Sequence, residues 1–175
     1  MSAQANPRLA LRPYLPADAP LLAEIFRASI EELTAEDYSQ AQRGAWAAAV
    51  DDEAAFAARL KQGLTLIATL GGSPVGFVSL KGTEELDLLY VHPAVAGQGI
   101  GAMLCDAVEK LAASRGTPRL TADASDSARG FFERRGYVAQ RRNTVLSGDE
   151  WLANTTMEKR LAPIASAPKP QGSTS

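Results

Sequence analysis

The part of this 175-residue sequence best suited to hold a ligand is a glycine-rich turn, with glycines at positions 97, 99 and 101. Because glycine has no Cβ atom, a ligand can come close to the backbone amides of Gly97–Ala102. The turn opens a predicted helix, so these amides lack helical acceptors and lie at the positive end of the helix dipole. The segment therefore predicts a site for a phosphate or diphosphate. The plainer alternative is a flexible turn that lets the helix pack tightly on a sheet.

A nucleotide-binding motif of another kind also fits the turn. Gly97, Gly99 and Ala102 match the spacing of the dinucleotide fingerprint of nicotinamide and flavin enzymes. In that motif the glycines follow the first strand directly, whereas here Gly97 stands six positions after Val91 and earlier strands precede it. A Walker phosphate-binding loop is excluded because no Gly-Lys-Ser or Gly-Lys-Thr follows the turn. A dinucleotide-dependent oxidoreductase is thus the weaker alternative.

Composition and charge narrow the classes of protein. Apolar residues make up 46% and charged residues 22% of the chain, which is typical of a soluble globular protein. The formal net charge of -2 lacks the basic excess of most nucleic-acid-binding proteins, so we expect no nucleic-acid partner. The sequence has no apolar run of the roughly 18 residues that a membrane helix needs, and its first residues have no signal-peptide core. We therefore expect a cytoplasmic protein that does not bind a membrane.

The single cysteine and the single histidine limit the chemistry further. Cys105 alone cannot form an internal disulfide or a multi-cysteine zinc site, and no cluster of metal ligands is visible in the sequence. We interpret Cys105, within a predicted helix, as a small core residue. His92 precedes Pro93 at the end of a predicted strand, where a turn role is more common than catalysis. We expect no metal.

Apolar spacing and turn residues predict one α/β domain over residues 8–161, preceded by a leader (1–7) and followed by a disordered tail (162–175). The expected strands cover residues 9–15, 64–70, 75–80, 85–91, 119–123, 137–146 and 150–161. The expected helices run from 16 to about 30, from 36 to 46, from 51 to 62, from 98 to 115 and from 125 to 135. Consecutive strands at both ends favour antiparallel pairing, and the strand–helix–strand units in the middle favour parallel pairing.

Three segments form a pattern in a fixed order. The first is Leu88-Leu-Tyr-Val-His-Pro followed by Gly97-Gln-Gly-Ile-Gly101, the second is Ser125–Tyr137, and the third is the terminal Met157–Leu161. Together they resemble the GNAT superfamily of acyl-CoA-dependent N-acetyltransferases, whose second signature reads N-x-x-A-x-x-F-Y-E-K-x-G-F. The resemblance covers about residues 8–161. It implies a mixed, mostly antiparallel sheet flanked by helices, with a splayed pair of central strands.

The resemblance implies acetyl-CoA as the cosubstrate. The amides of the glycine turn would hold its diphosphate, and free backbone groups of the splayed strand would bind the pantetheine arm. The resemblance also implies that a backbone N–H near Leu89 donates to the developing oxyanion. The residues implied to bind acetyl-CoA are Leu89, Tyr90, Val91, Gly97, Gln98, Gly99, Ile100, Gly101, Ala102, Ser125, Ala128 and Phe132.

The sequence departs from the family pattern at three positions. Ala96 replaces the first Gln or Arg of the glycine motif, and Ser125 replaces the usual asparagine. The family tyrosine that often protonates the leaving thiolate aligns with Phe132, which cannot donate a proton. Tyr90 or a water molecule is the substitute that we consider. The alternative to an N-acetyltransferase is therefore a non-catalytic acyl-CoA-binding or sensing domain.

Transfer of an acetyl group to an amine also needs a group that takes the amine proton. Asp87, three positions before Tyr90 on the predicted central strand, is the first candidate for this catalytic base, and Glu85 is the second. The plainer interpretation of Asp87 is a structural or solvent-facing carboxylate.

An acceptor pocket is predicted from residues spaced by four. Tyr38, Gln42 and Trp46 would share one face of a helix and could wall the binding site of a small-molecule or peptide amine. Equally, Tyr38 and Trp46 could anchor that helix to the sheet. The sequence does not distinguish these interpretations, and it leaves a homodimer open.

Overall fold

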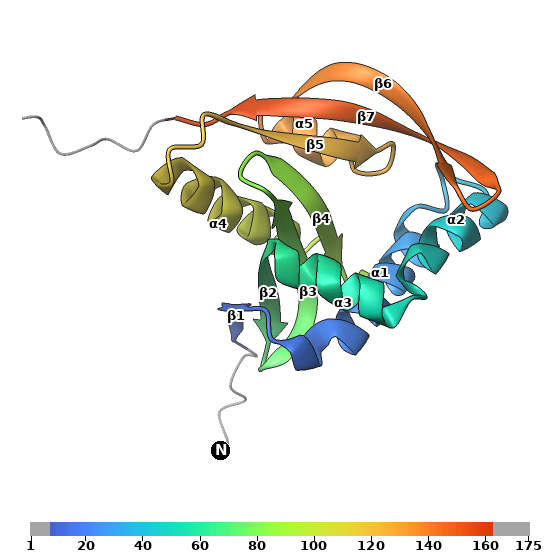
Figure 1. Cartoon of the computed structure of the whole chain (residues 1–175), viewed down its shortest axis with the longest axis horizontal. Helices are drawn as coiled ribbons and strands as arrows, with labels where there is room; N and C mark the ends of the chain where they lie inside the picture. The colour runs from blue at the N-terminus through green and yellow to red at the C-terminus, as the bar shows by residue number, and fades with distance from the viewer. Residues whose placement is uncertain (1–7, 163–175) are drawn as a thin grey trace, which may run out of the picture.

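The computed structural model describes residues 8–162, in which the strands join into a single sheet (Figure 1). The strands are β1 (Leu9–Pro13), β2 (Leu64–Leu70), β3 (Ser73–Lys81), β4 (Glu85–Val91), β5 (Arg119–Ser125), β6 (Val138–Ser147) and β7 (Glu150–Arg160). The α-helices are α1 (Ala19–Leu33), α2 (Gln40–Ala47), α3 (Glu53–Gln62), α4 (Ile100–Ser114) and α5 (Arg129–Arg134). This order of helices and strands is the one that the sequence predicts.

The sheet has the strand order β1-β2-β3-β4-β5-β7-β6. Neighbouring strands of the described chain pair antiparallel, except that β4 and β5 pair in parallel. A parallel pair needs a long crossover connection, and α4 supplies it between β4 and β5. The expected mixed, mostly antiparallel sheet is therefore confirmed, including its parallel step in the middle.

Helices cover both faces of the sheet because each presents an apolar stripe that must leave water. Helices α1 and α3 pack on one face, where Phe26 and Leu60 are buried. Helices α4 and α5 pack on the other face, where Leu104 is fully buried. The side chains of β3 alternate between the two faces: Phe77 packs with residues of α1 and α3, and Val78 packs with residues of α4 and α5. The sheet is thus fixed from both sides.

The central strands β4 and β5 separate soon after they begin. In the described chain their ladder consists of Glu85 opposite Thr121 and Leu86 opposite Ala122, although both strands continue beyond these pairs. The register between β3 and β4 shifts at the same point, which makes Asp87 the additional residue of a β-bulge. Figure 1 shows the result, with β2–β4 and β5–β7 running in different directions. The expected splayed pair is confirmed.

The helix expected from residue 36 begins four residues later, at the start of α2. The Ser39 hydroxyl accepts a hydrogen bond from Gln42 N, and the Gln42 side chain accepts one from Ser39 N. This capping box sets the first turn of the helix. Tyr38 therefore precedes the helix, and the expectation that it shares a helix face with Gln42 and Trp46 is wrong.

The helix expected over residues 125–135 is also shorter. Strand β5 continues through Ser125, and Ser125 Oγ accepts a hydrogen bond from Ala128 N in the turn that follows. The turn leads directly into α5. Ser125 consequently lies on the sheet, at the edge of the gap between β4 and β5.

The expected leader (1–7) and residues 163–175 of the expected tail lie outside the described residues. Within residues 8–162, no helix combines the length and the apolar character needed to cross a membrane. The same part of the chain contains no group of three or more His, Cys, Asp or Glu side chains that could hold a metal ion.

Candidate active site

The glycine turn presents backbone amides without acceptors. Gly97 and Gly99 have φ angles of 81° and 80°, in the left-handed region that other residues rarely adopt. Gly99 is the N-cap of α4, and the first helical hydrogen bond runs from Met103 N to Gly99 O. The amides from Gly97 to Ala102 donate no hydrogen bond to any described residue. The turn is thus a row of free donors at the positive end of a 15-residue helix, which suits an anion.

A cavity of about 270 Å³, which we call the interstrand cavity, lies where β4 and β5 separate. Gly101 places the end of the glycine turn at this cavity. Beyond the paired residues the β4 backbone no longer bonds to β5, so it can receive an extended ligand as an added strand would. The residues expected to bind the cofactor that line its walls are Leu89, Tyr90, Val91, Gly101, Ser125, Ala128 and Phe132. Of the others, Gly97, Gln98 and Gly99 form the adjoining turn, and Ile100 and Ala102 lie in the first turn of α4.

A second cavity, of about 280 Å³, is lined by residues of α1, α2 and the tip of the β6–β7 hairpin, and we call it the hairpin cavity. Hydrogen bonds tie the hairpin to α2. Gln42 Nε2 donates to Trp151 O at 2.9 Å, and Ser147 Oγ donates to Ala45 O at 3.2 Å. Figure 1 shows α2 beside the hairpin tip. These contacts hold the hairpin tip, which lines the hairpin cavity, against α2.

The two cavities meet at the gap between β4 and β5. The residues that line both are Trp46, Asp87, Tyr90, Asp123 and Ser125. A group held in one cavity and a group held in the other would therefore come together beside two carboxylates and a phenol. Such an arrangement suits a transfer reaction between two bound molecules, because it holds the reacting atoms close to one another.

Asp87 lies at this junction but is engaged by Arg59 of α3. The guanidinium donates from Nε to Asp87 Oδ2 and from Nη2 to Asp87 Oδ1, each at 2.8 Å. The Asp87 side chain is 12% exposed, and its hydrogen bonds to the guanidinium raise the pKa of Arg59. The first candidate for the base therefore lies at the junction, with its charge balanced by a cation that the sequence analysis did not identify.

Tyr90 packs toward α1. Its ring centroid lies 4.5 Å from that of Phe26 and 5.8 Å from that of Phe77. Burial disfavours the phenolate and raises the pKa of Tyr90 to about 12. Tyr90 therefore stays protonated at neutral pH and can donate a hydrogen bond to a negative charge at the junction.

Phe132 is part of the wall of the interstrand cavity. It is 4% exposed and packs edge-on against Phe131 and Tyr137, with ring centroids at 5.3 Å and 5.0 Å. Its ring has no hydroxyl, so this position of α5 supplies shape to the cavity and no proton.

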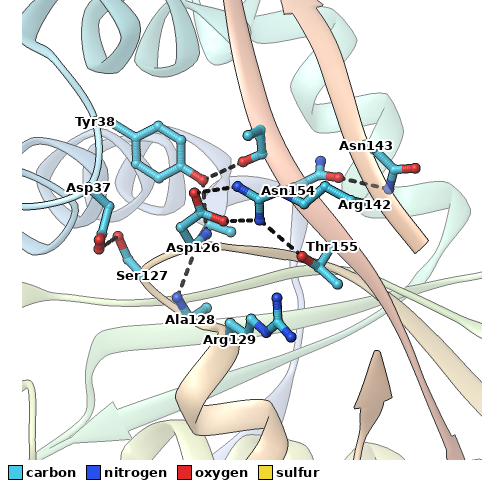
Figure 2. Close-up of polar contacts among 12 residues, drawn as sticks. Asp37, Tyr38, Asp126, Ser127, Ala128, Arg129, Arg142, Asn143, Asn154 and Thr155 are labelled. Atoms are coloured by element: carbon cyan, nitrogen blue, oxygen red, sulfur yellow. Dashed lines mark hydrogen bonds and ion pairs between the residues drawn. The ribbon is translucent and has the colours of Figure 1, made fainter. Parts of the chain in front are cut away.

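Tyr38 joins three segments of the chain, as Figure 2 shows. Its hydroxyl donates to Ala153 O at 2.6 Å and accepts from Asp126 N at 2.9 Å. Asp126 is held in turn by Arg142, whose guanidinium donates to both carboxylate oxygens. Tyr38 is 5% exposed and its ring lies 5.4 Å from that of Trp46. These contacts agree with the anchoring alternative, although Tyr38 also lines the hairpin cavity.

The structure divides the residues expected to bind the acceptor and adds two that sequence reasoning missed. Trp46 lines the hairpin cavity beside Tyr38, whereas Gln42 lines neither cavity. Arg59 gave no local signal because it stands 28 positions from Asp87. The sequence did contain a signal for Asp123, because it stands between two alanines on a strand. Both alanines are buried, so the Asp123 side chain projects away from the core.

Comparisons with known proteins identify the family of the chain. The family model described as an acetyltransferase (GNAT) domain matches residues 34–161. The uncharacterised N-acetyltransferase YafP of Escherichia coli is 30% identical, over 84% of this chain and 93% of its own length. The peptidyl-lysine N-acetyltransferase YjaB of Salmonella typhimurium is 31% identical, over 71% of this chain and 69% of its own length.

Solved structures share the fold. A GCN5-related N-acetyltransferase from Rhodopseudomonas palustris is 61% identical, with a TM-score of 0.86 over 92% of this chain and 99% of its own. The N-acetyltransferase PaiA of Thermoplasma acidophilum, solved in complex with coenzyme A, is 21% identical, with a TM-score of 0.74 over 87% of this chain and 99% of its own. The resemblance noted in the sequence is confirmed: the chain belongs to the GNAT superfamily and is an acyl-CoA-dependent N-acetyltransferase.

Proposed function

We propose that the protein transfers an acetyl group from acetyl-CoA to a primary amine of a small molecule or a peptide, by direct attack of the amine on the thioester. The observation that carries this proposal is the meeting of the interstrand cavity and the hairpin cavity at the gap between β4 and β5. One substrate can enter beside the glycine turn and the other beside the hairpin. Two molecules held in this way react as if at very high concentration.

The glycine turn fits the diphosphate of acetyl-CoA. A Cβ atom built on Gly97 or Gly99 would meet no atom within 4 Å, so the space beside the free amides is open. The pantetheine arm would follow the unpaired backbone of Leu89–Val91 in the manner of an added strand. The complex of the relative PaiA with coenzyme A supports this proposal.

Direct attack agrees with the placement of the one cysteine of the chain. Cys105 is fully buried in the core, and burial raises the pKa of its thiol to about 12. A protonated and inaccessible thiol is a poor nucleophile, because the thiolate is the reactive form. An acetyl group carried on this cysteine is therefore not part of the proposed mechanism.

Acetyl-CoA supplies an activated acetyl group and a thiolate leaving group. Burial raises the pKa of Tyr90 to about 12, above a thiol pKa near 8.5, so proton transfer from Tyr90 to the thiolate would be uphill. We therefore propose that Tyr90 stabilises developing charge through a hydrogen bond, while the thiolate receives the proton that the acceptor nitrogen releases, carried to it by water. A backbone N–H near Leu89, on the unpaired stretch of β4, would donate to the oxyanion.

The acceptor would bind in the hairpin cavity, among Tyr38, Trp46 and the apolar residues of the hairpin. The naming of the relative YjaB for peptidyl-lysine supports an amine as the acceptor. The amine must lose a proton before it attacks, and the carboxylates at the junction are Asp87 and Asp123. A homodimer stays a prediction.

Two measurements test the proposed function. Titration calorimetry with acetyl-CoA should show saturable binding. A thiol-release assay with Nα-acetyl-lysine amide, alanine amide and benzylamine should show turnover that depends on the amine and exceeds hydrolysis. Binding without amine-dependent turnover would contradict the proposed acceptor, and no binding would contradict the proposed cosubstrate.

A further inference from the structure

We infer that Asp123, and not Asp87, is the carboxylate that takes the proton from the acceptor amine, an assignment that rests on the proposed function. Asp123 directly follows Ala122, the last residue of β5 that pairs with β4. The side chains of Ala122 and Ala124 are buried in the core, so the side chain between them projects from the opposite face. Asp123 is exposed and lines both cavities at their junction.

The two carboxylates of the junction differ in what already binds them. Both oxygens of Asp87 accept charge-assisted hydrogen bonds from Arg59, each 2.8 Å long. Asp123 forms no ion pair within the described residues. Its Oδ1 accepts a hydrogen bond from Thr156 Oγ1 at 2.6 Å, and its Oδ2 accepts none from the described chain. Asp123 therefore keeps one oxygen free to receive a proton.

A row of hydrogen bonds across β6, β7 and β5 orients Asp123. Arg141 Nε donates to Asn143 Oδ1 at 2.8 Å, which fixes the orientation of the amide. Asn143 Nδ2 then donates to Thr156 Oγ1 at 2.7 Å. Because this bond occupies a lone pair of the Thr156 hydroxyl, the hydroxyl hydrogen is directed to Asp123 Oδ1. Thr156 and Asn143 are therefore positioning residues, and the proton is accepted at Asp123 Oδ2.

The charges around the junction favour an ammonium ion beside Asp123. Arg59 balances Asp87, and Arg142 balances Asp126, in each case through hydrogen bonds to both carboxylate oxygens. Asp123 remains as an unbalanced negative charge that lines both cavities. A protonated primary amine entering from the hairpin cavity is therefore attracted to the group that will deprotonate it.

The proposed reaction has three steps. Asp123 Oδ2 takes one proton from the ammonium ion, directly or through one water, and leaves the neutral amine. The amine nitrogen forms a bond to the thioester carbonyl carbon, and the carbon–sulfur bond breaks with its electron pair on sulfur. The nitrogen then releases its second proton, which water carries to the thiolate, and Asp123 later returns its proton to solvent. The products are an N-acetyl amine, coenzyme A as the thiol, and one proton.

The test compares Asp123→Asn with Asp87→Asn and with the control Glu158→Gln. Glu158 lies on β7, opposite Thr121 of β5, and lines neither cavity of the site. We expect Asp123→Asn to lower kcat for Nα-acetyl-lysine amide by about 100- to 10 000-fold, the usual contribution of a general base, with the Kd for acetyl-CoA unchanged. We expect Asp87→Asn to lower kcat by less than about 10-fold and Glu158→Gln to leave it unchanged.

A second variant separates catalysis from structure. Formate should raise the kcat of Asp123→Ala at least 10-fold, because a small carboxylate can occupy the vacated space and accept the proton. Thr156→Val should lower kcat while leaving KM for the amine unchanged, and formate should not rescue it. Thermal unfolding would establish that each variant is folded.

The outcomes distinguish the two proposals. Wild-type protein that binds acetyl-CoA but acetylates no amine of the panel would overturn the proposed function and this assignment with it. Wild-type turnover together with near-normal kcat in Asp123→Asn would overturn the assignment of Asp123 alone. A large loss in Asp87→Asn with no loss in Asp123→Asn would return the role of base to Asp87. Failure of formate to rescue Asp123→Ala would also count against Asp123 as the base.

Discussion

Replacement of Gly99 by aspartate should weaken the binding of coenzyme A by placing a negative charge at the free amides of the turn. A Cβ atom at this position meets nothing within 4 Å, so the loss does not come from a clash with the protein. The φ angle of 80° costs an ordinary L-residue about 1–2 kcal/mol. Repulsion between unit charges about 4 Å apart ranges from about 1 kcal/mol in water to about 4 kcal/mol near a protein surface.

The matched control for this charge is Gly99→Asn. Asparagine has nearly the same size and, like aspartate, tolerates a positive φ better than most residues. The ratio of the two Kd values therefore isolates the charge. With a repulsion of about 1–4 kcal/mol, aspartate should bind coenzyme A about 5- to 700-fold more weakly than asparagine.

Titration calorimetry at two salt concentrations measures this ratio. The ratio should fall as salt rises from 0.1 M to 1 M, because the Debye length shrinks from about 10 Å to about 3 Å. Pantetheine, which lacks the diphosphate, should bind both variants equally. Equal affinities of the two variants for coenzyme A, at both salt concentrations, would refute the placement of the diphosphate at this turn.

Three further predictions concern stability. Tyr38→Phe leaves a backbone amide and a backbone carbonyl without their partner, so urea denaturation should show a loss of about 1–3 kcal/mol in the free energy of unfolding. Arg12 donates two 2.8 Å hydrogen bonds to Asp18 and lowers its pKa, so this stabilisation is present above about pH 4 and is lost as the pH falls through the lowered pKa. On acidification, the free energy of unfolding of Asp18→Asn should therefore fall by about 1 kcal/mol less than that of the wild type. A Cβ atom at Gly63 would clash with a backbone carbonyl of β3, so Gly63→Ala should lower the melting temperature. The control Gly44→Ala, in open space on α2, should raise the melting temperature, because alanine favours a helix over glycine by about 0.5–1 kcal/mol.

The elements that the sequence predicts well are those fixed by local pattern. The apolar stripe of α1 and the turn between β2 and β3 depend on residues a few positions apart, and the structure has both where they are expected. The boundary of α2 was predictable too, because Ser39 and Gln42 have the spacing of a capping box. The error there came from extending the spacing of four back to Tyr38, across the residue that begins the helix.

The contacts that define the site are not local, and the sequence alone does not predict them. Arg59 meets Asp87 because α3 packs against the sheet at β2 and the long arginine side chain reaches β4, and no pattern within either element requires this pair. Asp123 receives its hydrogen bond from Thr156, which stands 33 positions later and on another strand. The bulge at Asp87 depends on how β3 and β4 pair, so it appears only when the strands are aligned. Residue types thus suggested a carboxylate as the base. Only the hydrogen-bond partners in the folded chain, Arg59 and Thr156, distinguish Asp87 from Asp123.

The irregular features of the sheet gather at one place, and together they explain how a core this well packed can hold a cosubstrate. A β4 strand paired with β5 along its whole length would satisfy its own backbone and leave no interstrand cavity. Here the pairs stop after Leu86, and the amides of the glycine turn are also free. Each backbone hydrogen bond contributes about 0.5–1.5 kcal/mol to folding, so an unbound site lacks stability that a ligand with matching polar groups can restore. Apolar clusters on both faces of the sheet hold the gap in place. Binding of acetyl-CoA should therefore stabilise the fold most strongly along β4 and the start of α4, where hydrogen exchange of backbone amides would slow on binding.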